Sequence, residues 1–286
     1  MITDNPSEVD YLLIGHLTAD IVEDGRQLGG TVSYAAKTAR AFGLRVGMLT
    51  SASAGEKLME AFDDDIQIVS LPAENTTTFE NIYEEDVRHQ FVRATARSLT
   101  FDDVPAVWHN TNLVHVAPLV KEVSPSIVAN FPKSIKLLTM QGMLRQWGED
   151  GLVKFKRWFD PEALKQFNFV VFSEEDIQHA PDLESSIAEL VPCLIVTRAE
   201  KGGTIYRAGT KTQYSAPQVD VTHLTGAGDI FACALLSSWH YLRDVDKAVA
   251  VSAKLASYSV TRVGLDSVPS ADDVRVQLAQ NGFSLD

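Results

Sequence analysis

The chain has 286 residues, 45% of them hydrophobic, and a formal net charge of −13. This length and composition suit one sizeable α/β domain, and the negative charge argues against a nucleic-acid or anionic-membrane partner, because phosphate polymers need clustered Lys and Arg. The first residues lack a basic region followed by an apolar one, and no apolar run approaches the roughly 20 residues that span a bilayer. We therefore expect a soluble cytoplasmic protein without a membrane partner.

Short apolar runs bounded by polar turns recur along the first two thirds of the chain, with helix-like stretches between most of them. This alternation predicts βα units around a largely parallel central sheet. The predicted strands are Tyr11–Gly15, Arg45–Thr50, Ile66–Leu71, Leu113–Ala117, Ile135–Met140, Phe169–Phe172 and Cys193–Thr197.

Two further regions differ from this pattern. Thr76–Tyr83 and Arg88–Arg93 alternate polar and β-favouring residues around a short acidic segment, 84–87, which predicts an antiparallel hairpin near the sheet edge. The C-terminal third shows apolar residues at three- and four-residue spacing, which predicts helices over 229–241, 246–262 and 271–281. No linker or repeat interrupts the chain, so we expect a single domain over residues 1–286. Cys193 and Cys233 lie in apolar segments without metal or redox spacing and are expected to be reduced core residues.

The strongest local signal is Thr225-Gly226-Ala227-Gly228-Asp229, which leads directly into an apolar helix. Small residues allow consecutive backbone N–H groups to converge on an anion, and the helix dipole favours negative charge at the same point. That dipole would also stabilise Asp229 as a carboxylate, able to take a proton from a hydroxyl that attacks a phosphate. The alternative is a tight loop with a helix-capping Asp. The spacing fits neither a Walker A loop nor a dinucleotide fingerprint.

This segment resembles the signature of the PfkB (ribokinase-like) carbohydrate kinases, and further pieces follow in the family's order along nearly the whole chain. The resemblance implies a three-layer α/β fold with a mostly parallel central sheet and a minimal β lid. It also implies transfer of the γ-phosphoryl group of ATP, with Mg²⁺, to an alcohol group of a small sugar or polyol. Asp229 would be the catalytic base, and Gly226, Ala227 and Gly228 would bind the transferred phosphoryl group.

The other pieces of the resemblance assign binding residues. Three of them flank the substrate: Asp20 after the first strand, and the pair Gly29-Gly30 before the helix over 31–42. Each has an ordinary alternative, since Asp20 can cap a turn and a glycine pair can form a left-handed turn. The nucleotide-binding residues that the resemblance implies, each of which also suits a buried strand, a turn or a helix end, are Thr197, Gly202, Thr225, Ser257 and Gly264.

Two charged residues are candidates near the phosphates and the substrate. Asp176, in Ser173-Glu174-Glu175-Asp176, takes the place of a family Glu near Mg²⁺ and would act through water, unless these acids only complement a helix dipole. Arg145 follows a predicted strand and would bind a substrate hydroxyl or a substrate phosphate, unless it forms a surface ion pair.

The chain departs from the family at several positions. His223 stands where the family has an Asp that often helps to hold a monovalent cation, and Tyr34 replaces an Asn that contacts the sugar in ribokinase. Only eight residues separate Asp20 from Gly29, so either the lid is minimal or the 76–93 hairpin supplies the cover.

Gln141-Gly142-Met143-Leu144-Arg145 and Thr77-Thr78-Phe79 resemble the inositol-kinase branch. The alternatives are a nucleoside kinase and a catalytically silent ligand-binding member, and the protein is expected as a monomer or homodimer.

Overall fold

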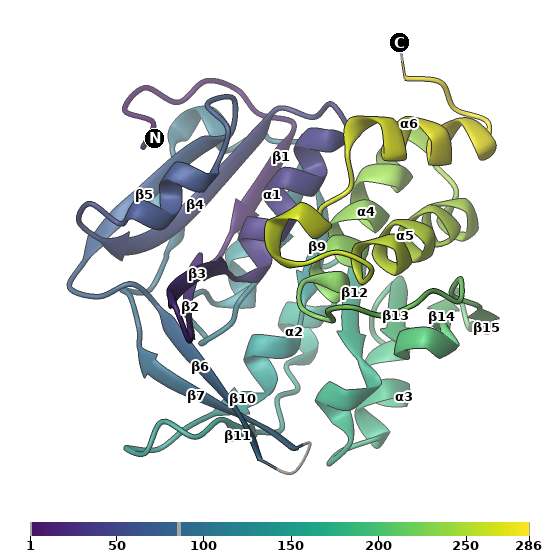
Figure 1. Cartoon of the computed structure of the whole chain (residues 1–286). Helices are drawn as coiled ribbons and strands as arrows, with labels where there is room; N and C mark the ends of the chain where they lie inside the picture. Colours follow the sequence, from purple (N-terminus) through teal and green to yellow (C-terminus); the bar gives the residue numbers. More distant parts are fainter. Residues whose placement is uncertain (1, 85–86, 286) are drawn as a thin grey trace.

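The computed structural model describes residues 2–84 and 87–285, so Glu85 and Asp86 of the predicted acidic segment lie outside the described residues. Within them, nine strands form a central sheet in the order β15-β14-β13-β12-β9-β8-β1-β4-β5 (Figure 1). The strands are β1 (Tyr11–Ile14), β4 (Val46–Ser53), β5 (Gln67–Ala73), β8 (Leu113–Val116), β9 (Ile135–Thr139), β12 (Phe169–Ser173), β13 (Cys193–Thr197), β14 (Gly203–Arg207) and β15 (Thr210–Tyr214).

The seven strands from β5 to β13 are parallel to one another, and they are the seven strands predicted from the apolar runs. Parallel strands that are covered on both faces read as continuous apolar runs, which made them visible in the sequence. Strands β14 and β15 add an antiparallel edge that was not predicted. β15 is mostly exposed and polar, so it lacks the apolar signal.

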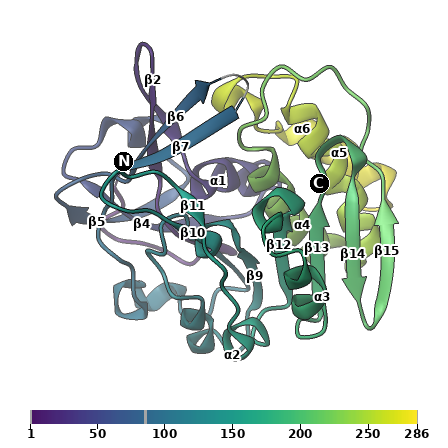
Figure 2. The ribbon, with the colours of Figure 1, turned by 90° about the horizontal axis from the view of Figure 1, so that it is seen from below.

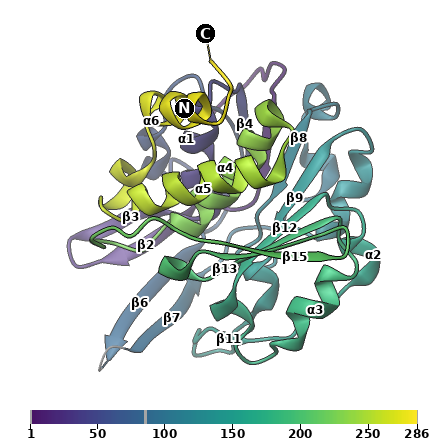
Figure 3. The ribbon, with the colours of Figure 1, turned by 90° about the vertical axis from the view of Figure 1, so that its right-hand side faces the viewer.

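Helices cover both faces of the sheet, which confirms the predicted three-layer α/β fold (Figure 3). One face packs against the longer helices through a core that includes Phe42, Phe231 and Leu235. The opposite face packs against short helices and 3₁₀ turns through Trp108, Phe131 and neighbours. The helices are α1 (Thr31–Ala41), α2 (Pro161–Leu164), α3 (Asp182–Ala188), α4 (Ala227–Leu242), α5 (Val245–Ser259) and α6 (Ala271–Gln280).

Not all of the helix-like stretches expected between the strands form α-helices. Between β8 and β9 the chain forms the 3₁₀ turn η4 (Pro125–Asn130), and between β4 and β5 it forms η1 (Lys57–Ala61). The two turns pack on opposite faces of the sheet, η1 through Met59 and η4 through Ile127 and Val128. The C-terminal helices are as predicted.

A second sheet projects from the carboxyl side of the central sheet and forms a lid (Figures 1 and 2). The order of its strands is β3-β2-β6-β7. Their bounds are β2 (Thr18–Val22), β3 (Gly25–Gly29), β6 (Thr78–Glu84) and β7 (Val87–Ala94). The predicted hairpin is β6 and β7. It pairs with the short β2 rather than with the central sheet edge, so the hairpin supplies most of the cover.

The outer edge of β7 faces a loop that carries two short strands, β10 (Arg145–Gln146) and β11 (Lys154–Phe155). The Val92 amide donates to the Gly151 carbonyl at 2.9 Å, and the Val153 amide donates to the Gln90 carbonyl at 2.8 Å. This loop fixes the hairpin against the body of the protein. Both cysteines are buried free thiols. No helix in the described part of the chain is long and apolar enough to cross a membrane.

Candidate active site

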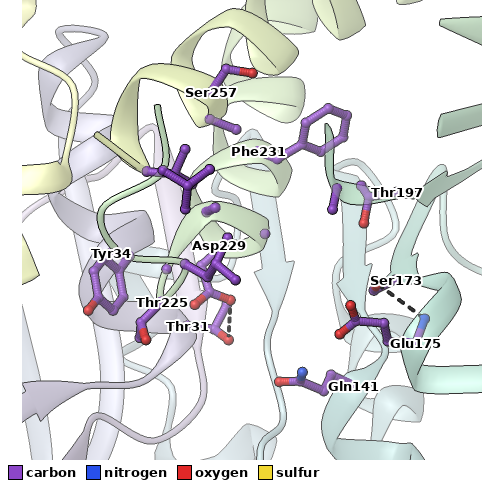
Figure 4. A pocket seen from close by; sticks show the side chains of 18 of the residues that line it. Thr31, Tyr34, Gln141, Ser173, Glu175, Thr197, Thr225, Asp229, Phe231 and Ser257 are labelled. Atoms are coloured by element: carbon purple, nitrogen blue, oxygen red, sulfur yellow. Dashed lines mark hydrogen bonds between the residues drawn. The ribbon is translucent and has the colours of Figure 1, made fainter. Parts of the chain in front are cut away.

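The order of the strands places a crevice at the carboxyl ends of β1 and β8. From β1 the chain first builds β4 and β5 on one side, and it then returns to β8 and continues to the other side. Open α/β sheets bind ligands where the strand order reverses in this way. A cavity of about 410 Å³ lies at this place, between the lid, the N-terminus of α4 and strand β13 (Figure 4).

The glycine-rich segment forms the centre of this cavity. Gly226, Ala227, Gly228 and Asp229 all line it, as predicted for the catalytic residues. Gly226 is the N-cap of α4 with φ 88°, a left-handed conformation that favours glycine, and a Cβ there would lie 2.5 Å from the Tyr34 ring. Among the described residues, no backbone acceptor is found for the Gly228 and Asp229 amides, which belong to the unsatisfied first turn of the helix. Free amides at the positive end of a helix dipole can bind an anion.

Asp229 lies beside this site and has an unusual protonation equilibrium. Burial raises the pKa of its carboxyl from 3.8 to about 6, and the neighbouring carboxylates of Asp176 and Asp20 also raise it. A 2.7 Å hydrogen bond from the Thr31 hydroxyl and the charge of Arg145 act in the opposite direction. The sequence predicted that the helix dipole stabilises the carboxylate, whereas burial and the neighbouring carboxylates raise its pKa. At neutral pH the group is still an ionised proton acceptor.

The predicted substrate residues Asp20, Gly30 and Arg145 line the lid-side half of the cavity, which we call the acceptor half. Asp20, on β2, accepts a hydrogen bond of 3.2 Å from the Thr18 hydroxyl, and burial raises the pKa of its carboxyl. Gly30 has φ 88° and caps α1, as the turn alternative expected. Gly29 does not line the cavity, but a Cβ there would lie 2.6 Å from the Asp20 carboxylate. Gly29 therefore positions Asp20.

Arg145 leaves the end of η5 (Gln141–Leu144), the turn that follows β9. Its guanidinium lies 5.7 Å from the centre of the Phe79 ring of the lid. Burial lowers the pKa of Arg145 to about 10, while the charges of Asp176 and Asp229 raise it, so the side chain stays cationic at neutral pH. The surface ion pair considered from the sequence is not formed among the described residues, because no carboxylate lies within 4.0 Å of this group.

The other half of the cavity, which we call the donor half, contains four of the five predicted nucleotide residues: Thr197, Gly202, Thr225 and Ser257. Thr197 ends β13, and Ser257 faces the cavity from α5 (Figure 4). Gly264 lies outside the cavity. A Cβ added at Gly264 would lie 2.8 Å from the side-chain amide nitrogen of Gln27.

The acidic turn after β12 differs in detail from the prediction. Asp176 is half-buried, and its carboxylate accepts from the Ser173 amide at 2.9 Å and from the Gln141 side-chain amide at 3.2 Å. Burial raises the pKa of this carboxyl. Glu175, one residue earlier, lines the cavity, and its carboxylate extends into it (Figure 4). Glu175 is thus the better placed of the two acids for a ligand.

Sequence reasoning missed several lining residues. Thr18 and Thr31 follow strand ends next to predicted residues, so adjacency was their only signal. Asn81, Arg88 and Gln90 come from the lid hairpin, whose position over the cavity depends on pairing with β2 and is invisible to local patterns. His223, where the family has an Asp, accepts a hydrogen bond from the Thr225 amide at 3.3 Å.

Comparison with known proteins agrees with this geometry. The model of the pfkB family carbohydrate kinases matches residues 162–271, which include the glycine-rich segment. This confirms the predicted family, and the kinases among the similar proteins support the predicted kinase class.

One curated relative is a nucleoside kinase of Methanocaldococcus jannaschii, 28% identical over 126 residues, which make up 42% of this chain and 42% of the relative. The chain thus matches less than half of the length of that relative.

Solved structures extend the similarity in fold to nearly the whole chain. A pyrophosphate-dependent kinase of the ribokinase family, complexed with a pyrophosphate analogue and myo-inositol, has a TM-score of 0.78 at 21% identity and covers 92% of this chain and 98% of its own. Ribokinase of Arabidopsis thaliana, complexed with ribose and ATP, has a TM-score of 0.74 at 17% identity, covering 97% and 100%. These similarities show the ribokinase-like fold.

Proposed function

We propose that the protein is an ATP-dependent phosphotransferase that moves the γ-phosphoryl group to an alcohol group of a small polyol or sugar. The observation that carries this proposal is the pairing of Asp229 with the free amides of the α4 N-terminus inside one cavity. A proton acceptor and an anion site at the same place are what transfer from a phosphate to a hydroxyl requires.

In the proposed reaction, an acceptor hydroxyl lies against Asp229 and its oxygen attacks the γ-phosphorus. The new O–P bond forms as the bond between the γ-phosphorus and the β-γ bridging oxygen breaks, ADP leaves, and the hydroxyl proton passes to the Asp229 carboxylate. The Gly228 and Asp229 amides face the negative charge on the transferred group. Thr31, which donates to Asp229 at 2.7 Å, holds the carboxylate in one orientation.

The site also fits Mg²⁺ held mainly through phosphates and water. The described residues contain no cluster of three or more potential metal ligands, but Mg²⁺ commonly takes only one or two carboxylates and completes its shell with substrate phosphates and water. Glu175, whose carboxylate extends into the cavity, would hold it, with Asp176 acting through water behind it. Bound there, the ion would neutralise charge on the donor phosphates.

ATP is the proposed donor, with pyrophosphate as the second candidate because three of the similar structures are of pyrophosphate-dependent kinases. The far end of the donor half is apolar and aromatic-lined, with Tyr214, Val219 and Val260 among its residues. Among the described residues, the charged groups that line the donor half are the acids Glu175 and Glu200. An apolar end suits a nucleobase, whereas bare pyrophosphate would need cations that this half lacks.

A polyol or sugar fits the acceptor half better than a nucleoside does. The half is lined by hydrogen-bonding side chains such as Asn81, Gln90 and Gln141, which suit a ring of hydroxyls. The Phe79 ring on this side is buried and has Arg145 over one face, so it offers little surface for stacking a base. An inositol-type polyol is therefore the preferred class, and the similarity to a nucleoside kinase keeps nucleosides as the second.

A monomer is favoured over a dimer formed through the outer edge of β7. Residues Gly151 to Val153 already occupy that edge through backbone hydrogen bonds. An exposed strand edge is what a second copy would need for pairing.

The test is a coupled assay of ADP release with Mg-ATP against inositols, ribose, fructose, sugar phosphates and nucleosides, and an assay of orthophosphate release with pyrophosphate as donor and the same acceptors. We expect turnover with ATP and a polyol or sugar, and its loss in Asp229→Asn. Turnover with pyrophosphate and none with ATP would show that pyrophosphate, rather than ATP, is the donor. ATP binding with silence across the panel would favour the catalytically silent alternative.

A further inference from the structure

Both ends of the lid hairpin are tied to one side chain of the body, His16. This residue follows β1 and is fully buried. Its Nε2 lies 2.8 Å from the Arg97 carbonyl, which follows β7, and its Nδ1 lies 2.7 Å from the Thr77 hydroxyl, which precedes β6. Since a carbonyl oxygen can only accept, Nε2 donates to Arg97. The Thr77 hydroxyl also accepts from the Ala96 amide at 3.0 Å, so the two ends of the hairpin are joined to each other as well as to β1.

Glu122 holds the loop of His16 against the loop that follows β8. Its side chain is buried, and the carboxylate accepts from three backbone amides: His16 at 2.9 Å, Leu119 at 2.9 and 3.2 Å, and Val120 at 2.8 Å. No cationic side chain pairs with it in the described part of the chain. A carboxylate only accepts, whereas a Gln side chain would place its own N–H donors against these donors. His16 and Glu122 form a buried polar junction, which we call the lid anchor.

The loop that Glu122 holds is also the apolar support of the lid. Leu119 and Val120 pack against Phe79 and Val92 of the hairpin in a small cluster of their own. Leu119 also lines the cavity. Because the carboxylate fixes the Leu119 and Val120 amides, it fixes the surface on which the hairpin lies.

The donor half of the cavity is built without the lid anchor. Its residues Thr197 and Ser257 come from β13 and α5, and the glycine-rich segment opens α4. Among the described residues, no hydrogen bond of His16 or Glu122 reaches these elements. The lid hairpin, by contrast, carries Asn81, which lines the acceptor half. A disturbance of the lid anchor should therefore move the acceptor wall and leave the donor wall in place.

We propose that His16 and Glu122 are positioning residues that hold the lid hairpin over the acceptor half and thereby set the affinity for the acceptor. This inference rests on the proposed function and assigns a role in it to two residues outside the cavity. Neither side chain lines the cavity, so an effect on the acceptor reaches it through the hairpin. Apolar side chains of similar size would fill the same space, but they would leave the amides and the Thr77 hydroxyl without these partners.

The first measurement is hydrogen–deuterium exchange of the intact protein, read by mass spectrometry, because it needs no turnover. Glu122→Gln and His16→Leu should make peptides that cover β6 and β7 exchange at least about tenfold faster, and leave peptides of β9, β12 and α4 within about twofold of the wild type. His16→Asn keeps a polar group near the Nδ1 position that can pair with Thr77, so it should restore part of the protection. Thr77→Val keeps the shape of the hairpin end without its hydroxyl, and it serves if the other variants do not fold.

Asp160→Asn and His109→Gln are the matched controls. The Asp160 carboxylate also accepts from two backbone amides, at 3.1 Å each, and the His109 Nε2 also lies near a backbone carbonyl, that of Val104 at 3.0 Å. Neither residue contacts the lid through these bonds. Both variants should show hairpin exchange like that of the wild type.

The second measurement is steady-state kinetics with Mg-ATP and an acceptor that the substrate panel identifies. In Glu122→Gln and His16→Leu, the KM for the acceptor should rise at least about tenfold, while the KM for ATP stays within about twofold. A merely structural role would lower the fraction of active enzyme, which reduces kcat and leaves both KM values unchanged.

Three results would overturn this inference. The first is hairpin exchange equal to that of the wild type, and the second is exchange that is faster to the same extent in β9, β12 and α4. The third is a KM for ATP that rises as much as the KM for the acceptor. A wild-type protein that turns over no acceptor would reject the proposed function instead, and the exchange data alone would then decide whether the lid anchor holds the hairpin.

Discussion

Replacement of Asp229 by Asn should abolish activity and at the same time stabilise the protein at neutral and alkaline pH. Folding raises the pKa of this carboxyl from 3.8 to about 6, so the ionised form is less favourable in the folded state than in the unfolded chain. Each pKa unit corresponds to about 1.36 kcal/mol, which sets an upper bound of about 3 kcal/mol on the stability lost through ionisation above pH 6. Asn removes this charge and keeps an oxygen that can accept from Thr31.

The sign of the pH dependence follows from the same shift. Below about pH 4 the carboxyl is protonated in both states, so the wild type and Asp229→Asn should have nearly equal stability. As the pH rises through 6, the variant should become more stable, up to about 3 kcal/mol or about 6 °C in Tm. Urea unfolding at pH 4 and pH 8 measures this difference.

Asp64→Asn removes a charge at an exposed turn and is the matched control. Its free energy of unfolding should differ little from that of the wild type at either pH. A variant of Asp229 that is no more stable than the wild type at pH 8 would refute the reasoning.

The remaining predictions concern the same site. The kcat/KM should fall about tenfold per pH unit below about 6, where Asp229 is protonated, and a flat profile down to pH 4.5 would exclude it as the base. Gly226→Ala should destabilise the fold by at least about 1 kcal/mol, because its φ is 88° and an added Cβ meets a tyrosine ring, as thermal unfolding would show. Gly228→Ala meets open space within 4 Å, so it should leave Tm unchanged or higher but raise the KM for ATP by crowding the anion site. Glu175→Gln should raise the Mg²⁺ concentration needed for half-maximal rate, whereas Glu174→Gln, whose carboxylate pairs with an arginine outside the site, should not.

Much of the fold could be predicted because its central strands are buried on both faces. The seven parallel strands appear as uninterrupted apolar runs, and the amphipathic C-terminal helices show a clear helical period. β15 was missed because its residues are polar and almost all exposed, and β14 was missed because its buried part includes only one large apolar residue, Ile205. The lid was foreseen as a hairpin, but its union with β2 depends on contacts between distant segments.

The part of the candidate site that comes from one short segment could be predicted from the sequence. Gly226 to Asp229 line the cavity within the first turn of α4, so a local pattern was sufficient to place them together. The pKa of Asp229 was not predictable in the same way, because it depends on burial and on charges brought by Asp20 and Asp176 from other elements. Likewise, Glu175 and Asp176 are adjacent in sequence, and only the turn geometry decides which one faces the cavity.

The most direct test of phosphotransfer is a ³¹P NMR spectrum of the protein with Mg-ATP and a mixture of polyols, sugars and their monophosphates. The proposed function predicts a new phosphate-ester resonance that grows in step with ADP, and neither signal with Asp229→Asn. Release of inorganic phosphate without a new ester, or equal ester formation by Asp229→Asn, would contradict it.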